Sequence, residues 1–318
     1  MKKKILVAVD DFSEAHIHAM TAAVTGWAEI VRLPQASEEA FYRNALASSL
    51  ICIGWPPAEW LFNASVQLLQ TGSSGWENYQ HKGLDQLPAF SLCTAKGIYS
   101  IGVAEHAIAM MLALVRRIPV HVHDKDHKQF RRHLPYAPEI TGAAACIVGM
   151  GDIGREIARR CRGLGMKVTG IVKNRKDDLI EYADLILPLS QLEDAVADAD
   201  HIFLSIPGSA ENDRVFNEYI FSKCKPSAFF YNVSRGSTVD EEVLCEHLRS
   251  GTIAGAGLDV SQIEPLPAES KLWSLEDNVL ITGHSAGLSS GYPNRFCVLA
   301  IKNLGNYHSG TPLENKVI

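Results

Sequence analysis

The segment 143–168 limits the possible folds of this chain more than any other, because it reads AAACIVGMGDIGREIARRCRGLGMKV. An apolar run leads directly into Gly149, Gly151 and Gly154, and residues with a helical apolar period follow. In this order the first glycine allows a tight turn, the second lets a pyrophosphate approach the backbone, and the third lets the helix pack close to the strand. The helix N-terminus then faces the negative charge. The segment therefore predicts a strand, a turn and a helix that together bind a dinucleotide.

Short apolar runs of the β type alternate with helical patterns along the chain, which predicts parallel sheets covered by helices. In a first series we expect helices at 14–24 and 37–46, the latter opened by Ser37, and strands at 4–9, 29–33, 50–54 and 66–72. In a second series, after a helix at 103–117, we expect strands at 143–148, 167–172, 201–206, 228–233, 255–260 and 278–282. A last amphipathic helix, at 294–310, is expected to pack back on the first series.

Composition and charge exclude several other classes of protein. The chain has 318 residues, 47% of them apolar, which suffices for one large or two medium domains. A formal net charge of −6 with both signs interspersed gives no broad basic face, so no nucleic-acid partner is expected. No uncharged apolar run approaches the ~18 residues of a membrane span, so we expect a soluble protein. The seven cysteines form no C-x-x-C pair, which favours a reducing cytoplasm.

Three of the four histidines in a polar segment at 117–140 could suggest a metal site, His121, His123 and His127. Two of them, His123 and His127, are spaced so that they could share a helix face, as metal ligands often do. Aspartates and lysines are interleaved throughout the segment, and that pattern favours a solvated linker helix. We therefore expect no metal.

Charged side chains follow the last three predicted strands, at the end where a doubly wound sheet binds its ligand. Arg235 comes after the fourth strand of the second series, Asp259 and Glu264 lie at and beyond the end of the fifth, and His284 follows the sixth. Taken singly, each also fits an ordinary loop residue. Together, an arginine, a carboxylate and a histidine beside a dinucleotide loop suit the polarisation of a carbonyl and the transfer of a proton.

Several motifs in a fixed order resemble the D-isomer-specific 2-hydroxyacid dehydrogenase family. They read VGMGDIG, NVSRGSTVDEEVLCEHLRSGTIAGAGLDV, EPLP and ITGHSAG, and the resemblance runs from about LLQTGSSGWENY to beyond His284. The stretches GWPPAEWL and LPAESKLW are similar to the glyoxylate and hydroxypyruvate reductase branch. The resemblance implies an NAD(P)-dependent oxidoreductase that interconverts a small 2-oxo acid, glyoxylate or hydroxypyruvate, and the (R)-2-hydroxy acid.

The resemblance also implies the architecture, an α/β fold of two Rossmann-like or flavodoxin-like doubly wound parallel-sheet domains. The NAD(P)-binding domain, 99–287, is expected to be inserted in a substrate domain made of 1–98 and 288–318. The apolar stripe of segment 102–117 is similar to the subunit contact of the family and favours a homodimer. An ordinary core face explains the stripe equally well.

The resemblance assigns roles to single residues of the second series. Arg235 is implied to be the catalytic arginine, His284 the acid and base, and Glu264 its carboxylate partner, with Asp259 at the nicotinamide carboxamide. The residues expected to contact the cofactor are Gly149, Met150, Gly151, Asp152, Ile153, Lys173, Asn174, Arg175, Ile206, Pro207, Val233, Ser234 and Asp259.

The substrate carboxylate is implied to bind backbone amides around Ser74, Gly75 and Trp76 in the first series, and Arg235 in the second. The chain departs from the family at Trp76, where a smaller residue is usual, and at Ser261, where an aromatic residue is usual. Both departures leave the shape of the substrate pocket open.

The loop after the second strand of the second series bears on the choice of cofactor. An acid about 20 residues beyond the glycines usually accepts hydrogen bonds from the adenosine ribose of NAD. That count leads to Val172, and Lys173, Asn174, Arg175 and Lys176 follow it. The missing acid and the added bases both favour NADP, while NAD remains possible if the loop is only a solvated basic turn.

Three functions remain open. The leading one is reduction of glyoxylate or hydroxypyruvate, because the loops 54–60 and 287–293 hold no cationic cluster for a phosphate. A 3-phosphoglycerate dehydrogenase type of enzyme is the first alternative, and we expect no room for a regulatory domain after the last helix. A non-catalytic dinucleotide-binding redox sensor is the second, since fold alone does not establish chemistry. The complete set of Arg235, Glu264 and His284 disfavours the sensor.

Overall fold

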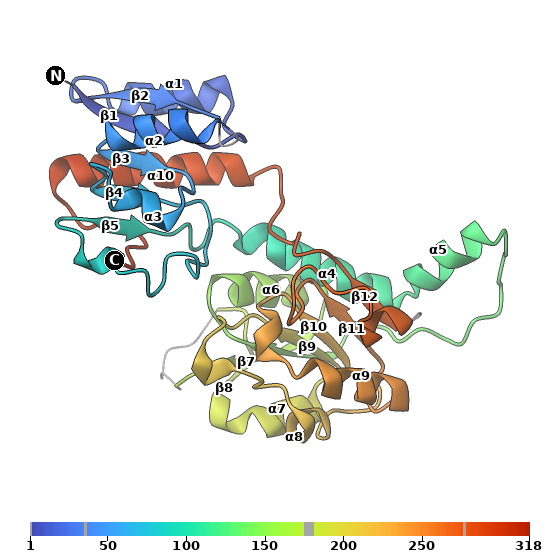
Figure 1. The fold of residues 1–318 in the computed structure, drawn as a ribbon. Coiled ribbons are helices and arrows are strands. Elements are labelled where there is room, and N and C mark those ends of the chain that lie inside the picture. Colours follow the sequence, from blue (N-terminus) through green and yellow to red (C-terminus); the bar gives the residue numbers. More distant parts are fainter. Residues whose placement is uncertain (1, 35–36, 175–180, 276–277) are drawn as a thin grey trace. The chain divides into compact units, whose positions relative to one another are not determined.

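The computed structural model describes residues 2–34, 37–174, 181–275 and 278–318. The chain forms two compact units, one made of Met1–Tyr99 with Ser289–Ile318 and the other of Ser100–Leu288 (Figure 1). Each unit contains one sheet with parallel strand pairs. The expected α/β class with two parallel doubly wound sheets is confirmed. Which unit binds substrate and which binds cofactor stays a prediction.

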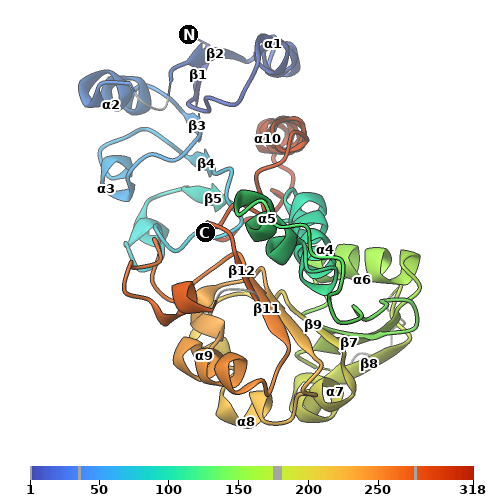
Figure 2. The ribbon, with the colours of Figure 1, turned by 90° about the vertical axis from the view of Figure 1, so that its right-hand side faces the viewer.

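The first unit contains a five-stranded sheet in the order β2-β1-β3-β4-β5. Its strands are β1 (Lys3–Val7), β2 (Ala28–Arg32), β3 (Ile51–Ile53), β4 (Leu68–Gln70) and β5 (Ser91–Cys93). Its helices are α1 (Glu14–Ala23), α2 (Glu39–Ala47), α3 (Ala58–Leu61) and α10 (Tyr292–Ser309). Helices α1 and α10 lie on one face of the sheet, and α2 and α3 lie on the other (Figure 2).

Alternating side chains of β1 divide the core of the first unit into two layers, because successive residues of a strand point to opposite faces. Ile5 and Val7 belong to the layer under α1 and α10, and Leu6 belongs to the layer under α2 and α3. Phe296 and Leu304 of α10 are fully buried in the first of these layers. The expectation that the last helix packs back on the first series is therefore confirmed.

The second unit contains a seven-stranded sheet in the order β12-β11-β10-β9-β6-β7-β8. Its strands are β6 (Ala144–Val148), β7 (Lys167–Val172), β8 (Leu185–Pro188), β9 (His201–Leu204), β10 (Phe229–Asn232), β11 (Gly255–Leu258) and β12 (Val279–Ile281). Its helices are α4 (Ser100–Val115), α5 (Ile118–Asp126), α6 (Asp152–Gly163), α7 (Leu192–Asp198), α8 (Glu218–Phe221) and α9 (Glu241–Ser250). The short 3₁₀ helices are η1 (Leu84–Gln86) in the first unit, and η2 (Leu189–Gln191), η3 (Ala210–Asn212), η4 (Gly236–Thr238) and η5 (Lys271–Ser274) in the second.

The strand order of the second sheet marks where a ligand can bind. From β6 the chain runs outward through β7 to β8, and it then returns to β9 and runs outward on the other side to β12. The order therefore reverses between β6 and β9, which lie side by side. Doubly wound sheets bind ligands outside the carboxyl ends of their strands at such a point.

Helix α4 packs its apolar face inside the second unit. It lies against α6 and against β10, β11 and β12, and its residues Val103, Ala107 and Met111 are buried there (Figure 1). The apolar stripe therefore forms a core face of the second unit, and its expected part in a subunit contact stays a prediction. Among the described residues, no helix has the length and apolar character that crossing a membrane requires.

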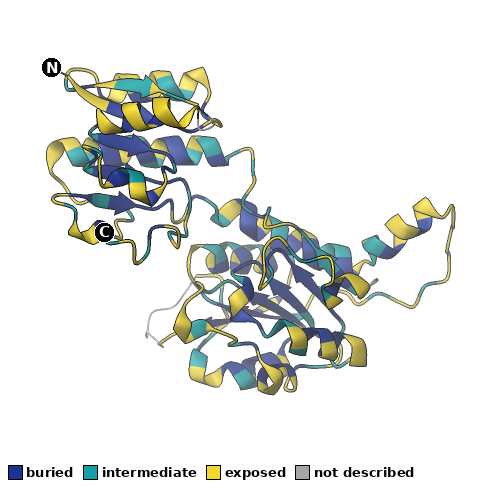
Figure 3. Ribbon diagram, viewed as in Figure 1, coloured by how far each residue is buried: buried dark blue, intermediate teal, exposed yellow. Residues whose placement is uncertain are grey.

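The segment after α4 contributes little to either core. Helix α5 is mostly exposed, and the residues that follow it form no regular structure until β6 (Figure 3). Phe130 and Tyr136 of this segment are almost fully exposed, at 91% and 103%. The expected surface helix and linker at 117–140 is therefore present.

The structure corrects the sequence analysis at three places. Strands β5 and β8 were not expected; β5 has only three residues, and β8 is a short, half-exposed edge strand that ends in Pro188. Ser37 does not open α2. Its hydroxyl donates a hydrogen bond to the Pro34 carbonyl oxygen, and α2 begins after Glu38 with no side-chain cap.

Candidate active site

The glycine loop after β6 has the geometry that a dinucleotide site needs. Gly149 has φ +100°, and a Cβ there would lie 2.8 Å from Cγ2 of Ile206. A Cβ at Gly154 would collide with the Gly149 carbonyl oxygen, so α6 can approach the turn only because this residue is glycine. Both positions therefore require glycine for conformation and packing.

Gly151 differs from the other two glycines. A Cβ there would meet nothing within 4 Å, so packing does not demand glycine at this position. The residue directly precedes α6, and because it has no side chain, a ligand can approach the backbone there. The N-terminus of α6 carries no side-chain cap, so an anion can bind its first amides. These residues fit a pyrophosphate.

The neighbouring cofactor positions differ in what their side chains do. Met150 is buried and packs beside Gly170 of β7, while Asp152 is exposed and Ile153 is half-buried. A contact of Met150 with a cofactor would therefore use the backbone. Ser205, which was not predicted, donates a hydrogen bond from Oγ to the Gly149 carbonyl oxygen over 2.8 Å and holds the turn.

The segments after β9 and β10 complete the predicted cofactor surface. Ile206 lies against the glycine turn, and the Pro207 carbonyl oxygen accepts a hydrogen bond from Asn212 over 2.9 Å. Val233 is buried. Ser234 directs both its amide and its hydroxyl to Oδ1 of Asn232, over 3.0 and 2.8 Å, so its side chain shapes this turn. Cofactor contacts at these residues stay predictions.

The basic loop after β7 is only partly described. Lys173 is exposed, and its Nζ lies 2.7 Å from Oε2 of Glu211 in η3. Asn174 ends the described part, and Arg175 lies outside the described residues. Glu211 was not anticipated, because it comes 38 residues after Lys173 in the chain. It places a carboxylate beside the base that was expected to hold a 2′-phosphate.

The three catalytic candidates follow adjacent strands. Arg235 comes three residues after β10, and His284 comes three residues after β12. His284 Nδ1 lies 2.7 Å from Glu264 Oε2, so the structure brings this predicted pair into direct contact. Both side chains are partly exposed, at 49% for His284 and 39% for Glu264, which leaves them accessible to a small molecule. A second oxygen of Glu264 accepts the Ser261 amide, which orients the carboxylate.

Arg235 lies on a loop that packs against the one carrying Glu264. A Cβ at Gly236 would collide with the carbonyl oxygen of Ser261, three residues before Glu264. The aliphatic part of Arg235 packs beside Gly208, directly after the predicted cofactor residues Ile206 and Pro207. Its Nη1 donates to the Ser234 carbonyl oxygen over 2.9 Å. Arg235 therefore stands between the glycine-loop side and the histidine side of this edge.

Asp259, which the family resemblance implies to meet the nicotinamide carboxamide, directly follows β11. It is 2% exposed, and its carboxylate accepts hydrogen bonds from Oγ1 of Thr282 and from the amides of Ser285 and Ala286, over 2.6, 2.9 and 3.0 Å. The structure therefore gives it a role in holding the loop of His284. A contact with the nicotinamide carboxamide stays a prediction. The role of Thr282 has no local sequence signal.

The predicted substrate loop of the first unit follows β4. Ser73 Oγ donates a hydrogen bond to the Gly75 carbonyl oxygen over 2.8 Å, and the hydroxyl of Tyr99 donates one to the Gly72 carbonyl oxygen. Burial raises the pKa of Tyr99, which keeps this hydroxyl a donor. Within the described part of the chain, no group accepts a hydrogen bond from the amides of residues 74–76. The side chain of Trp76 packs on the core below α2 and α3.

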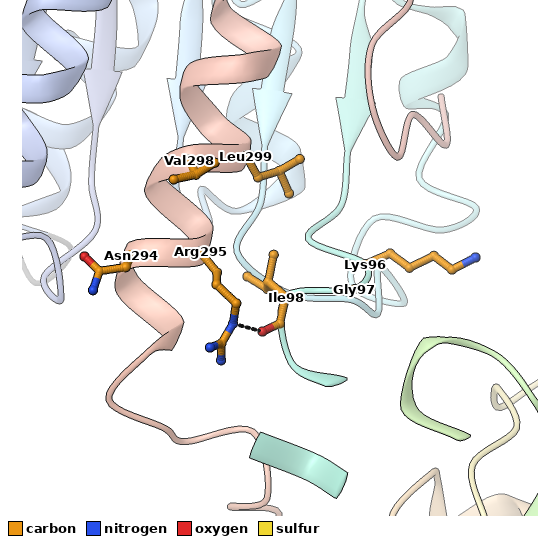
Figure 4. A pocket seen from close by; sticks show the side chains of 7 residues that line it. All are labelled: Lys96, Gly97, Ile98, Asn294, Arg295, Val298 and Leu299. Atoms are coloured by element: carbon orange, nitrogen blue, oxygen red, sulfur yellow. Dashed lines mark hydrogen bonds between the residues drawn. The ribbon is translucent and has the colours of Figure 1, made fainter. Parts of the chain in front are cut away.

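Among the described residues of the first unit, two cavities are lined by none of the predicted site residues. One, of about 360 Å³, lies between the 96–98 segment and α10; Figure 4 shows Arg295 there, turned toward the Ile98 carbonyl oxygen 2.6 Å away. The other, of about 270 Å³, lies beside Pro56 and Pro57.

One of the three candidate histidines, His127, directly follows α5 and is bound to that helix. His127 Nδ1 lies 2.9 Å from the His123 carbonyl oxygen, and the buried carboxylate of Asp124 is held by Arg131. Arg131 is also the main cause that lowers the pKa of Asp124. Among the described residues, no group of three potential metal ligands is present. The expectation that the protein needs no metal stays a prediction.

The two parallel sheets and the glycine turn are typical of a dinucleotide-binding α/β protein, and Glu264 and His284 lie in hydrogen-bond contact on the same sheet edge as the turn. Residues 108–286 match the model of the D-isomer specific 2-hydroxyacid dehydrogenase, NAD binding domain. The chain therefore belongs to the D-isomer specific 2-hydroxyacid dehydrogenase family, whose members are oxidoreductases.

Individual relatives agree with this family. A glyoxylate reductase of Korarchaeum cryptofilum is 30% identical over 227 residues, which are 70% of this chain and 67% of the relative. A D-3-phosphoglycerate dehydrogenase of Archaeoglobus fulgidus is also 30% identical over 227 residues, but the match spans only 42% of its length. A family protein of known structure from Aeromonas salmonicida subsp. salmonicida is 26% identical with a TM-score of 0.87, covering 100% of this chain and 99% of its own.

Proposed function

We propose that the protein is an NAD(P)-dependent D-2-hydroxyacid dehydrogenase that reduces a small 2-oxo acid to the (R)-2-hydroxy acid. The observation that carries the proposal is the hydrogen bond between His284 Nδ1 and Glu264 Oε2, on the same sheet edge as the glycine turn. A redox sensor has no need of such a pair.

The side chains divide the chemistry between them. Glu264 accepts a hydrogen bond from the Nδ1–H group of His284. Nε2 is therefore the ring nitrogen that delivers a proton to the carbonyl oxygen. Arg235 binds the carboxylate and the carbonyl oxygen of the 2-oxo acid and stabilises the negative charge that develops there. The nicotinamide cofactor supplies the hydride when it is bound.

The amides of Ser74, Gly75 and Trp76 in the first unit are proposed to hold the substrate carboxylate. Their lack of an acceptor within the described part of the chain supports this role, because an anion would satisfy them. We favour glyoxylate or hydroxypyruvate, in keeping with the name of the K. cryptofilum relative. The relative from A. fulgidus makes 3-phosphoglycerate the alternative.

NADPH is proposed to be preferred over NADH. The position that usually carries an acid is Val172, and Lys173 is exposed beside it. Glu211 opposes the preference, because its carboxylate occupies Lys173 and would repel a 2′-phosphate. The preference therefore depends on whether the phosphate displaces Glu211.

A homodimer in the cytoplasm completes the proposal. The segment after α4 exposes Ile118, Val122, Phe130 and Tyr136, apolar side chains that a second copy could cover. All seven cysteines are free and buried, in keeping with a reducing compartment. Sedimentation of the purified protein would measure the oligomeric state, and a monomer at micromolar concentration would contradict the dimer.

The proposed function is tested by following the oxidation of NADPH and NADH with a panel of 2-oxo acids. We expect turnover of glyoxylate or hydroxypyruvate, and faster turnover with NADPH. Turnover of 3-phosphohydroxypyruvate alone would replace the proposed substrate, and no turnover with any acid while the cofactor binds would favour the sensor.

A further inference from the structure

The backbone around His284 has an unfavourable conformation that three hydrogen bonds hold in place. His284 has φ +52°, in the left-handed region that residues with a Cβ rarely adopt. Its amide donates to the Asp259 carbonyl oxygen over 2.7 Å, and the next two amides donate to the Asp259 carboxylate over 2.9 and 3.0 Å. Three successive amides thus end on one residue, and this arrangement directs the His284 ring toward Glu264.

The Asp259 carboxylate is itself held by Thr282. The hydroxyl of Thr282 donates to Oδ1 of Asp259 over 2.6 Å, so its single proton is used there. Nε2 of His106 lies 2.9 Å from the same hydroxyl and must therefore be the donor. Since His106 belongs to α4, which packs against β11 and β12, this chain of hydrogen bonds ties the His284 loop to the core of the second unit.

We propose that His106 and Thr282 are positioning residues that act through Asp259 to hold His284 in the left-handed conformation in which it meets Glu264. The inference rests on the proposed function, because it takes His284 as the proton donor. Neither residue touches the proposed reacting atoms. Their effect is on the fraction of molecules in which the His284 ring stands where the proton must be delivered.

The test compares Thr282→Val with Thr282→Ser. Valine keeps the branched shape but removes both hydrogen bonds, and serine keeps the hydroxyl. We expect kcat of Thr282→Val to fall roughly tenfold or more, as for a small displacement of a catalytic group, and Thr282→Ser to retain most of it. The dissociation constant of NADPH, measured by its fluorescence, should change little in either variant.

A second pair, His106→Leu and His106→Gln, repeats the test one step further from His284. The glutamine amide can still donate to Thr282, so we expect it to preserve kcat better than leucine. If Thr282 and His106 had only a structural role, Thr282→Val and His106→Leu would have a lower thermal midpoint, and kcat and cofactor binding would fall together. Serine or glutamine would then not restore kcat.

Hydrogen–deuterium exchange of the peptide around 283–288 gives a readout that needs no activity. We expect faster exchange in Thr282→Val than in the wild type, and wild-type exchange in Thr282→Ser. Unchanged exchange in Thr282→Val would overturn the inference whatever the enzyme reduces. Wild-type kcat in Thr282→Val would also overturn it and would leave the proposed function standing. If Thr282→Val also lost affinity for NADPH, the result would indicate that Asp259 acts on the cofactor and not on the loop.

Discussion

The two ends of the proposed active edge in the second unit are built in opposite ways. At the β10–β12 end, Asp259 is buried, and its carboxylate and carbonyl oxygens accept hydrogen bonds from the loop of His284. At the β7 end, Lys173 meets Glu211 in a single ion pair whose side chains are 67% and 61% exposed. Buried hydrogen-bond networks hold a geometry, whereas exposed ion pairs hold little and are screened by salt.

The difference follows from what each end has to do. Proton transfer needs a heavy-atom distance of about 2.6–3.2 Å, so the histidine end must be fixed before the substrate arrives. Discrimination between two ribose substituents needs only a local charge, and a mobile side chain can supply that. Changes at the histidine end should therefore lower turnover, and changes at the β7 end should alter the choice of cofactor.

The largest effect is expected for His284→Ala. Removal of the proton donor should lower kcat by roughly 10²-fold or more, while the NADPH dissociation constant stays close to that of the wild type. Steady-state rates with glyoxylate, combined with cofactor fluorescence titration, would measure both. Wild-type turnover in this variant would show that the pair with Glu264 is not the proton donor.

Gly154→Ala should weaken cofactor binding strongly, because the new Cβ would collide with the Gly149 carbonyl oxygen and displace the turn. Gly163→Ala is the matched control, since it lies in the same helix and a Cβ there meets nothing within 4 Å. The control should bind NADPH as the wild type does and gain a little thermal stability, as alanine favours helix. Equal NADPH affinity in the two variants would contradict the assigned role of the turn.

These predictions also show which parts of the site could be derived from the sequence. Gly149 and Gly154 were identified because the strand, the turn and the helix are continuous in the chain. Glu264 and His284 were identified because parallel strands end at one edge of a sheet, although 20 residues separate them. The family resemblance then supplied their roles.

The missed features have in common that they depend on packing between distant elements. His106 and Thr282 are 176 residues apart and lie on a helix and a strand end whose contact only the fold creates. Glu211 belongs to a short 3₁₀ helix with no pattern of its own. Strand β8 has partly exposed side chains, and its pairing with β7 is what defines it.

The sheet that carries both ends contains a titratable group that should limit stability in acid. Burial lowers the pKa of His201 on β9 to about 4, so the folded protein keeps the ring neutral while the unfolded chain takes up a proton below about 6.5. Stability should therefore decrease as the pH falls from about 6.5 to about 4, by up to about 3 kcal/mol. Urea unfolding at several pH values would measure this. His201→Phe should flatten the dependence over that range, and an unchanged slope would assign it to other groups.

The smallest effect, and the sharpest test of the contrast, is expected at the Lys173–Glu211 pair. Lys173→Ala should raise the Michaelis constant for NADPH by several-fold and leave that for NADH nearly unchanged, because only NADPH carries the 2′-phosphate. Glu211→Gln should act in the opposite direction, since it frees the ammonium group and removes a negative charge.

The control for these two variants is Lys302→Ala, which breaks an equally short pair with Glu314, also exposed, in the first unit and should change neither constant. Raising the salt concentration should reduce the difference between Lys173→Ala and the wild type, because the charges at the β7 end are exposed to solvent. The kcat of His284 variants should not respond to salt in this way. If Lys173→Ala changes both Michaelis constants equally, or if the wild type prefers NADH, the basic loop is only surface and the contrast between the two ends does not extend to cofactor choice.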